Sequence, residues 1–206
     1  MSDRRANLLG LCGALILFPT LILAQGTWYG DQDALWKQQD GVSQPLVELA
    51  TDLRAIARTA AGGGWIAIDG QSEVIHVDSD GVILEVVETD VGVQSLAIDS
   101  LGRVWGTRPG LDDVIVISAG EGVVATHAVG SVPYGISIDG LDRVWVSCSY
   151  GNVIQILDSD GDLVQEHAVG FFPTGITAAR DGGIWLAEKE GLRRLSSDGM
   201  TIWSGV

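Results

Sequence analysis

The chain has 206 residues, 46% of them hydrophobic, and a formal net charge of −15. That length suffices for one compact domain with its own hydrophobic core. The negative charge argues against nucleic acid and anionic lipid surfaces as partners, because both would repel the chain.

The first 24 residues are typical of a secretory signal. They begin with the basic end MSDRR, continue with the apolar stretch LLGLCGALILFPTLILA and end at the small residue Ala24. We expect residues 1–24 to be cleaved and the protein to be secreted or periplasmic, with an uncleaved anchor as the alternative. The signal holds two arginines and one aspartate, so the mature chain keeps 10 basic and 26 acidic residues, a net charge of −16. Its only cysteine is Cys148, so it can form no internal disulfide.

Tryptophans recur at a fixed spacing through the rest of the chain. Steps of forty residues separate Trp65, Trp105, Trp145 and Trp185. The segments SLAIDSLGRVW, GISIDGLDRVW and GITAARDGGIW, which end at the last three, share an apolar run and a turn. A period near forty with strand-like sequence in each copy is typical of β-propeller blades, each a four-stranded sheet.

The repeat predicts an all-β propeller of four full blades plus part of a fifth. Trp28 begins the partial blade at its second strand, so the innermost strand of that blade is missing from the mature chain. Either the ring is five-bladed with an incomplete first blade, or the chain is a fragment of a six- or seven-bladed propeller. In an uncleaved chain the segment FPTLILA, which ends at Ala24, could supply the missing strand, because it resembles FPTGITA at 172–178. The predicted propeller domain, residues 25–206, divides into a part at 25–50 and blades at about 51–91, 92–131, 132–171 and 172–206.

Residues 45–61 contain a conflict between two patterns. The segment PLVELATDLRAIARTAA has apolar residues at helical spacing and is rich in alanine. The forty-residue repeat assigns the same residues to an outermost strand followed by an innermost one. We predict strands, because packing against neighbouring blades overrides local propensity.

The blade motif P-x-G-I…D-G-x-x-W-x-x-E…G is clearest in FPTGITAARDGGIWLAEKEGLRRLSSDG, residues 172–199. It resembles the streptogramin-lyase (virginiamycin B lyase) and NHL-repeat propellers over about residues 50–206. The resemblance implies a scaffold that hosts lyases, lactonases, sensors and binding modules. For the lyases it also implies a magnesium-binding glutamate and two histidines, one of them the catalytic base. Glu188 matches the glutamate, but Cys148 and Glu190 stand where the histidines belong, which puts lyase activity in doubt.

The residues three positions after each tryptophan differ from blade to blade: Asp31, Ile68, Arg108, Cys148 and Glu188. The repeat places them in a ring on the face where the second strand of each blade turns into the third. Side chains that vary at a symmetric position are what a site grafted onto a scaffold would show. We therefore predict a binding site on this face that includes Asp31, Arg108, Tyr134, Cys148, Tyr150, Glu188 and Glu190.

The sequence is consistent with three functions. The first is an exported propeller that binds an unknown small molecule or protein through its loop face. The second is a metal-assisted lyase or lactonase in which Glu188, with Glu190, holds magnesium or calcium. The third is an assembly unit that self-associates through open blade edges and completes its ring with another chain. Apart from the export signal we expect no membrane contact.

Overall fold

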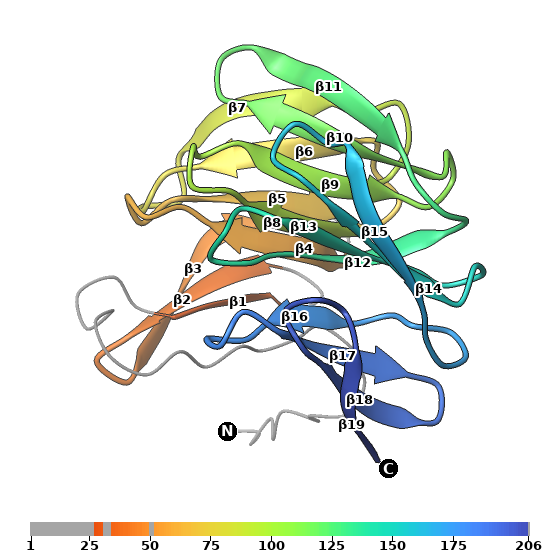
Figure 1. Ribbon diagram of the computed structural model, residues 1–206. Coiled ribbons are helices and arrows are strands. Elements are labelled where there is room, and N and C mark those ends of the chain that lie inside the picture. The colour runs from red at the N-terminus through yellow and green to blue at the C-terminus, as the bar shows by residue number, and fades with distance from the viewer. Residues whose placement is uncertain (1–26, 31–33, 50–51, 206) are drawn as a thin grey trace.

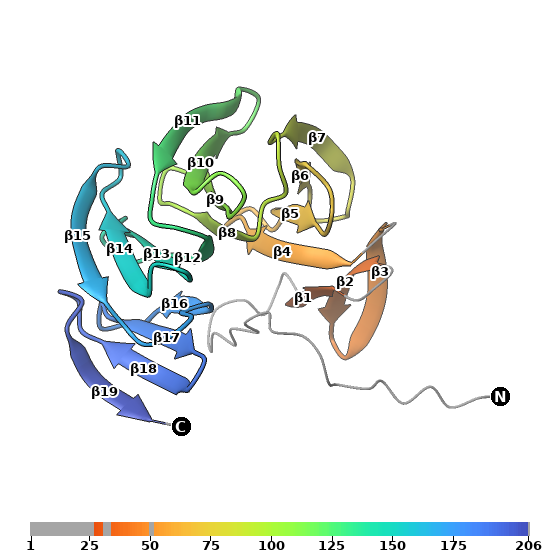
Figure 2. The ribbon, with the colours of Figure 1, turned by 90° about the vertical axis from the view of Figure 1, so that its right-hand side faces the viewer.

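The computed structural model describes residues 27–30, 34–49 and 52–205. These residues form five antiparallel sheets arranged as an arc, with the first and fifth sheets at its ends (Figures 1 and 2). Within the described ranges no helix is long and apolar enough to span a membrane. The predicted signal at 1–24, its FPTLILA segment and Asp31 lie outside the described residues.

We call the sheets blades 1 to 5 in chain order. Blade 1 has three strands and each of the others has four, with neighbours in sequence paired as neighbours in the sheet. The strands are β1 (Thr27–Gly30), β2 (Ala34–Gln39) and β3 (Val42–Glu48) in blade 1; β4 (Leu53–Arg58), β5 (Gly64–Ile68), β6 (Glu73–Val77) and β7 (Ile83–Glu88) in blade 2; β8 (Ser95–Ile98), β9 (Val104–Arg108), β10 (Asp113–Ser118) and β11 (Gly122–Ala128) in blade 3; β12 (Pro133–Ile138), β13 (Val144–Cys148), β14 (Val153–Leu157) and β15 (Leu163–Ala168) in blade 4; and β16 (Ile176–Ala178), β17 (Ile184–Glu188), β18 (Gly191–Leu195) and β19 (Thr201–Gly205) in blade 5.

The structure confirms the predicted all-β propeller and its blade pattern. Each sheet lies within one of the ranges that the repeat assigns to a blade. Residues 45–48 are the end of β3 and residues 53–58 form β4, so the strand interpretation is confirmed over the helical one. Trp28 lies on β1, the strand that corresponds to the second strand of the complete blades.

The repeat tryptophans occupy corresponding places in successive sheets. In blades 2 to 5 each lies on the second strand, directly opposite a residue of the innermost strand. A small side chain at the opposite position leaves room for the indole beside it. These small partners are Ala57, Ala97, Ser137 and Thr177.

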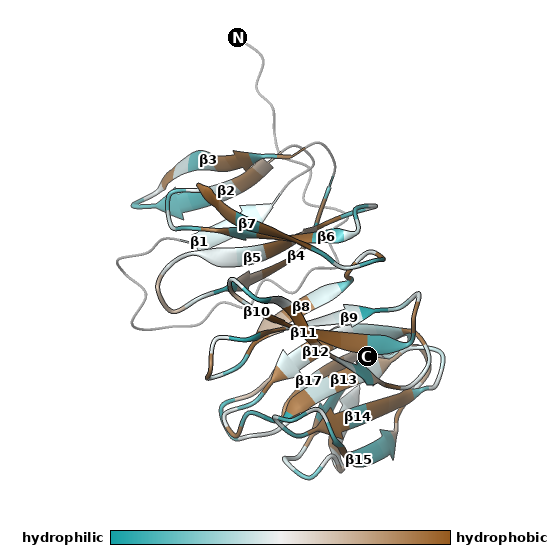
Figure 3. Ribbon diagram, turned by 90° about the horizontal axis from the view of Figure 1, so that it is seen from above, coloured by the Kyte–Doolittle hydropathy of each residue, from teal (hydrophilic) through white to brown (hydrophobic). Residues whose placement is uncertain are grey.

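The indole of one blade packs against the apolar face of the next blade. Trp105 lies in a buried cluster with Val144, Val146 and Leu157 of blade 4. The tryptophans of blades 1, 2 and 4 lie in corresponding clusters with blades 2, 3 and 5. Burying one tryptophan removes roughly 150–250 Å² from water, which is about 4–6 kcal/mol of hydrophobic stabilisation. Figure 3 shows the hydrophobic residues concentrated on strands, including β4, β11 and β14.

A carboxylate fixes the tryptophan of blade 3 and links it to blade 4. Asp99 Oδ2 accepts hydrogen bonds from the indole Nε1 of Trp105 at 3.0 Å and from Arg103 Nε at 2.7 Å. The Arg103 guanidinium lies over the indole, 5.6 Å from its centroid, and donates through Nη2 to the carbonyl oxygen of Ser159 in blade 4 at 2.7 Å. One side-chain network therefore joins the turn, the indole and the neighbouring sheet.

Asp139 makes the same contacts in blade 4. It accepts from Trp145 Nε1 at 2.9 Å and from Arg143 Nε at 2.8 Å, and Arg143 donates to the carbonyl oxygen of Ser197 in blade 5. Burial alone would raise the pKa of Asp139, but the hydrogen bonds from Trp145, Arg143 and backbone amides outweigh it and lower the pKa. The carboxylate is therefore ionised at neutral pH, as this network requires.

The outward face of blade 5 has no described sheet against it. Trp185 is 41% exposed, whereas its three equivalents in blades 2 to 4 are at most 1% exposed. Leu192 and Trp203 are also exposed, and the rings of Trp185 and Trp203 meet edge to face at 5.8 Å. This face is the surface that, in the other blades, the next blade covers.

Two repeated histidines join an outermost strand to the next blade. His127 on β11 stacks on Trp105 and reaches the turn of blade 4 that contains Gly161. His167 on β15 makes the corresponding contact with Gly199 in blade 5. Both glycines have positive φ, and a Cβ at either position would overlap the imidazole ring. Glycine is therefore needed there both for the backbone conformation and for the contact between blades.

We predict that Gly161→Ala destabilises the protein more than Gly120→Ala does. Both glycines have positive φ, so each substitution places alanine in the left-handed region at about 1–2 kcal/mol. No atom lies within 4 Å of a Cβ built at Gly120, whereas at Gly161 the His127 ring must move, at about 1–3 kcal/mol more. Urea unfolding of the two variants measures the difference. Equal losses would show that His127 does not pack on this turn.

Candidate functional site

The connections between strands form two opposite ends of the sheets. At one end the second strand of each blade turns into the third, and the outermost strand crosses to the innermost strand of the next blade. We call this end the loop face and the opposite end, which carries the two hairpins of each complete blade, the hairpin face. The loop face of blades 2 to 5 consists of turns at 69–72, 109–112, 149–152 and 189–190 and crossings at 89–94, 129–132 and 169–175.

Two crossings on the loop face contain bulky residues with left-handed backbone. Val132 has φ of 55° and Phe172, forty residues later, has φ of 52°. The amide of Val132 donates to Asp112 Oδ1 at 2.7 Å, and the amide of Phe172 donates to Asn152 Oδ1 at 3.0 Å. Each left-handed L-residue costs about 1–2 kcal/mol, and strain of this kind is concentrated at functional sites. The turn of one blade thus fixes the crossing to the next in a single conformation.

Aromatic side chains gather on the loop face between blades 4 and 5. The ring of Phe172 meets Tyr150 edge to face at 5.5 Å and Phe171 at 4.8 Å. Lys189 Nζ lies 5.7 Å from the centroid of the Phe171 ring. Tyr150 is 67% exposed and Phe171 is 53% exposed, so both rings offer surface to a partner. We call Tyr150, Phe171, Phe172 and Lys189 the aromatic cluster.

Arg108, the predicted site residue of blade 3, is buried in a bidentate ion pair. Its Nε and Nη2 donate to the two carboxylate oxygens of Asp113 at 2.8 and 2.6 Å. Its Nη1 donates to the carbonyl oxygen of Thr89, in the crossing from blade 2, at 2.9 Å. The buried guanidinium therefore holds the crossing from blade 2 to blade 3 in place.

Glu188, the corresponding residue of blade 5, makes the same kind of pair with the charges exchanged. Arg193 donates from Nε and Nη2 to its two carboxylate oxygens at 2.7 and 3.1 Å, and the amide of Gly170 donates to Oε1 at 2.6 Å. A magnesium ion at Glu188 would have to compete with the guanidinium for both oxygens. Among the residues that the structure describes, no three His, Cys, Asp or Glu side chains are grouped so that they could hold a metal ion. This donor set does not fit a resident divalent cation.

Cys148 occupies the same position in blade 4 and is fully buried. Its Sγ contacts Gln155, whose Oε1 accepts from the amide of Gly130 at 2.8 Å and whose Nε2 donates to Glu166 at 2.7 Å. Burial raises the pKa of the Cys148 thiol to about 12. The thiol is thus protonated at neutral pH and cannot act as a base in place of a histidine.

Arg108, Cys148 and Glu188 therefore share a position and a structural role. In blades 3 and 5 the residue itself forms a hydrogen bond with the backbone of the crossing that enters the blade. In blade 4 Gln155, the third-strand partner of Cys148, forms that hydrogen bond. They lie beneath the loop face rather than on its surface. Their participation in binding stays a prediction.

The other predicted site residues lie at the surface or near it. Tyr150 belongs to the aromatic cluster, Tyr134 is half-buried on β12, and Glu190 is exposed beside Lys189. The prediction missed Phe171 and Phe172. Their signal is the pair FF in the crossing at 171–172, where the crossing before it has the smaller pair SV.

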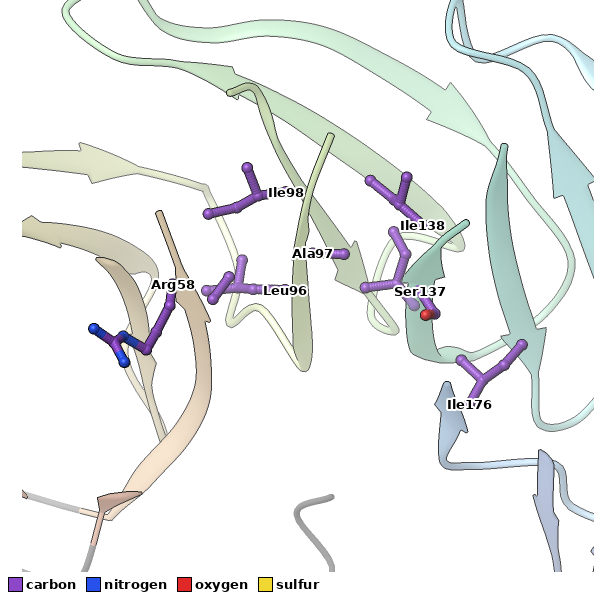
Figure 4. Close-up of a pocket in the computed structure, with 9 residues that line it drawn as sticks. Arg58, Leu96, Ala97, Ile98, Ser137, Ile138 and Ile176 are labelled. Atoms are coloured by element: carbon purple, nitrogen blue, oxygen red, sulfur yellow. The ribbon is translucent and has the colours of Figure 1, made fainter. Parts of the chain in front are cut away.

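The structure also contains two cavities away from the aromatic cluster. One, of about 250 Å³, lies along the innermost strands β4, β8, β12 and β16 (Figure 4). Its lining is mostly aliphatic, and Arg58 at its edge points away from Leu96 toward Trp28, 5.0 Å from that ring. The second, of about 240 Å³, opens between blades 2 and 3 on the loop face beside the ion pair of Arg54 and Asp69. The first cavity is lined by Ala57, Arg58, Leu96, Ala97, Ile98, Ile136, Ser137, Ile138 and Ile176.

Comparison with models of protein families and with curated proteins finds no match. Among solved structures the chain is similar to a streptogramin B lyase, with a TM-score of 0.65, 24% identity and coverage of 72% of this chain and 53% of the other. Virginiamycin B lyase from Staphylococcus aureus gives a TM-score of 0.65, 22% identity and coverage of 75% and 55%. A gluconolactonase from Xanthomonas campestris gives a TM-score of 0.64, 18% identity and coverage of 82% of this chain and 67% of the other.

These similarities show a streptogramin-lyase-like propeller fold. The chain spans about half the length of the two lyase structures. At such identities the likeness extends to the fold alone, and the activities in those names belong to the proteins that bear them.

Proposed function

We propose that the protein is an exported β-propeller that binds a ligand or protein partner through its loop face, at the aromatic cluster. Export is inferred from the signal-like sequence of residues 1–24. The observation that carries the binding proposal is the exposure of Tyr150 and Phe171 on a backbone held rigid by the Asn152 contact to Phe172.

The rings of Tyr150 and Phe171 contribute little to the stability of the fold. Both residues are more than half exposed, so much of their hydrophobic surface is uncovered. Aromatic side chains on a preorganised surface are typical of the centres of binding sites, because they bury much area at low cost in conformational entropy. Lys189 beside Phe171 adds a positive charge to a face of an acidic protein. A ligand with a flat apolar part and a negative group fits this combination.

The double substitution Tyr150→Ser and Phe171→Ser should remove binding without unfolding the protein. Peptides selected from a displayed library on the wild-type protein serve as the probe. We expect their affinity for the double variant to fall at least about tenfold, which corresponds to about 1.4 kcal/mol. Val86→Ser, an exposed apolar position on the outermost strand β7, is the control and should leave affinity unchanged. Selected peptides that bind the double variant as well as the wild type would contradict the proposal.

We propose as a second function that the protein assembles with another copy through the outward face of blade 5. Trp185 carries this proposal, because the next sheet covers its equivalents in blades 2 to 4, whereas no described sheet covers Trp185. A sheet-on-sheet contact of the kind repeated between the blades would cover it. We propose a blade of a second copy as the occupant, because the contact would extend an interface that the chain already uses.

Light scattering after size-exclusion chromatography tests the assembly. We expect a mass above the 21.7 kDa of the full chain. The double variant Leu192→Asp and Trp203→Ser should give the monomer mass, because a charge on that face opposes burial. A wild-type protein that stays monomeric at high concentration would refute the assembly and leave the loop-face proposal untouched.

A further inference from the structure

The hairpin face carries exposed leucines that the fold does not need. Leu101 and Leu141 lie at the tips of the first hairpins of blades 3 and 4, and each is 74% exposed. The corresponding tip residue is Ala61 in blade 2 and Asp181 in blade 5, and their turns close with the same backbone hydrogen bond. A small or a charged residue therefore suffices for the turn. The two leucines require another explanation.

The two leucine tips are tied to each other and to apolar residues of the next blades. The amide of Ser100, next to Leu101, donates to Asp142 Oδ1, next to Leu141, at 2.9 Å. Arg103 and Arg143 then link each tip to the second hairpin of the following blade. These second hairpins are followed in the chain by apolar residues that are more than half exposed. We call the two leucine tips, together with Leu163 and Met200, the hairpin patch.

The charges around the hairpin patch are mainly negative. Asp160, Asp162 and Asp198 are exposed in the same hairpins, and Arg180 is the exposed cation on the neighbouring tip of blade 5. Arg103 and Arg143 are paired with buried aspartates, so they add little positive charge to the surface. An apolar patch with a negative rim complements a surface that is apolar and basic. An anionic bilayer is a poor partner for the patch, because the negative rim would repel it.

We propose that the hairpin patch docks a basic amphipathic segment of a partner protein. The leucines would insert between its apolar side chains, and the aspartates would pair with its lysines or arginines at the rim. This contact lies at the opposite end of the sheets from the aromatic cluster. The protein would thus hold a ligand on one face and a partner on the other.

A model peptide with leucine and lysine at the spacing of an amphipathic helix tests the proposal by fluorescence anisotropy. We expect binding to the wild-type protein that weakens with salt. Leu101→Ser with Leu141→Ser should weaken it at least about tenfold. Leu111→Ser, an exposed leucine of the loop face, is the matched control and should bind as the wild type does. Because all three leucines are exposed, each variant should unfold at the wild-type urea concentration.

Further arms separate the alternatives. Asp160→Asn with Asp162→Asn should reduce the salt dependence, and a leucine–glutamate peptide should bind less tightly than the leucine–lysine peptide. Equal binding of the wild type and the double leucine variant would overturn the proposal. So would leucine-dependent binding to phosphatidylglycerol or phosphatidylcholine vesicles without binding to the basic peptide, since that would assign the patch to a membrane. The loop-face variants do not enter this test, so its failure leaves the function proposed for that face standing.

Discussion

The structure depends on covering one side of each sheet with the next sheet. A four-stranded blade is too small to bury both of its apolar faces, so it is stable only with a neighbour. The tryptophan on the second strand supplies the largest single part of each contact, and the small residue opposite leaves room for it. In blades 3 and 4 an aspartate and an arginine then fix the indole, and the arginine reaches the following blade. Blade 5 has the same indole without a described sheet against it, which is why Trp185 differs from the others.

The loops between the blades are held by side chains that differ in chemistry and agree in position. Blade 3 uses Arg108 with Asp113, and blade 5 uses Glu188 with Arg193. Blade 4 uses an amide and a buried thiol instead. Each solution satisfies a backbone group of the crossing, so a buried polar atom finds its partner. Variation at a symmetric position is therefore compatible with one structural role, and it is weak evidence for a catalytic site.

The sequence predicted the fold well because the repeat carries long-range information. The forty-residue spacing identified β3 and β4 as strands where local composition favoured a helix. The spacing could not show that Arg108 and Glu188 are buried, since it gives positions and not depths. A sign was present: Arg108 and Asp113, like Glu188 and Arg193, are opposite charges five residues apart. Arg108 and Asp113 lie directly opposite each other on paired strands, whereas Glu188 lies opposite Gly191, so Arg193 reaches it along the diagonal.

Tyr150 was the part of the aromatic cluster that the sequence predicted, whereas Phe171, Phe172 and the hairpin patch were not predicted. Leu101 is one of many apolar residues in a chain that is 46% hydrophobic, and only its exposure sets it apart. Exposure at a turn depends on which neighbours pack over it, and that follows from the assembled blades.

The contact of each tryptophan with the blade that follows it is measured most directly by nuclear Overhauser effects in methyl-labelled protein. We predict cross-peaks from the Trp105 indole to the methyl groups of Val144 and Val146, and from the Trp145 indole to those of Ile184 and Leu186. Two sets of contacts with the same forty-residue offset would establish the stacking. Indoles that contact methyl groups of their own blade alone would contradict it.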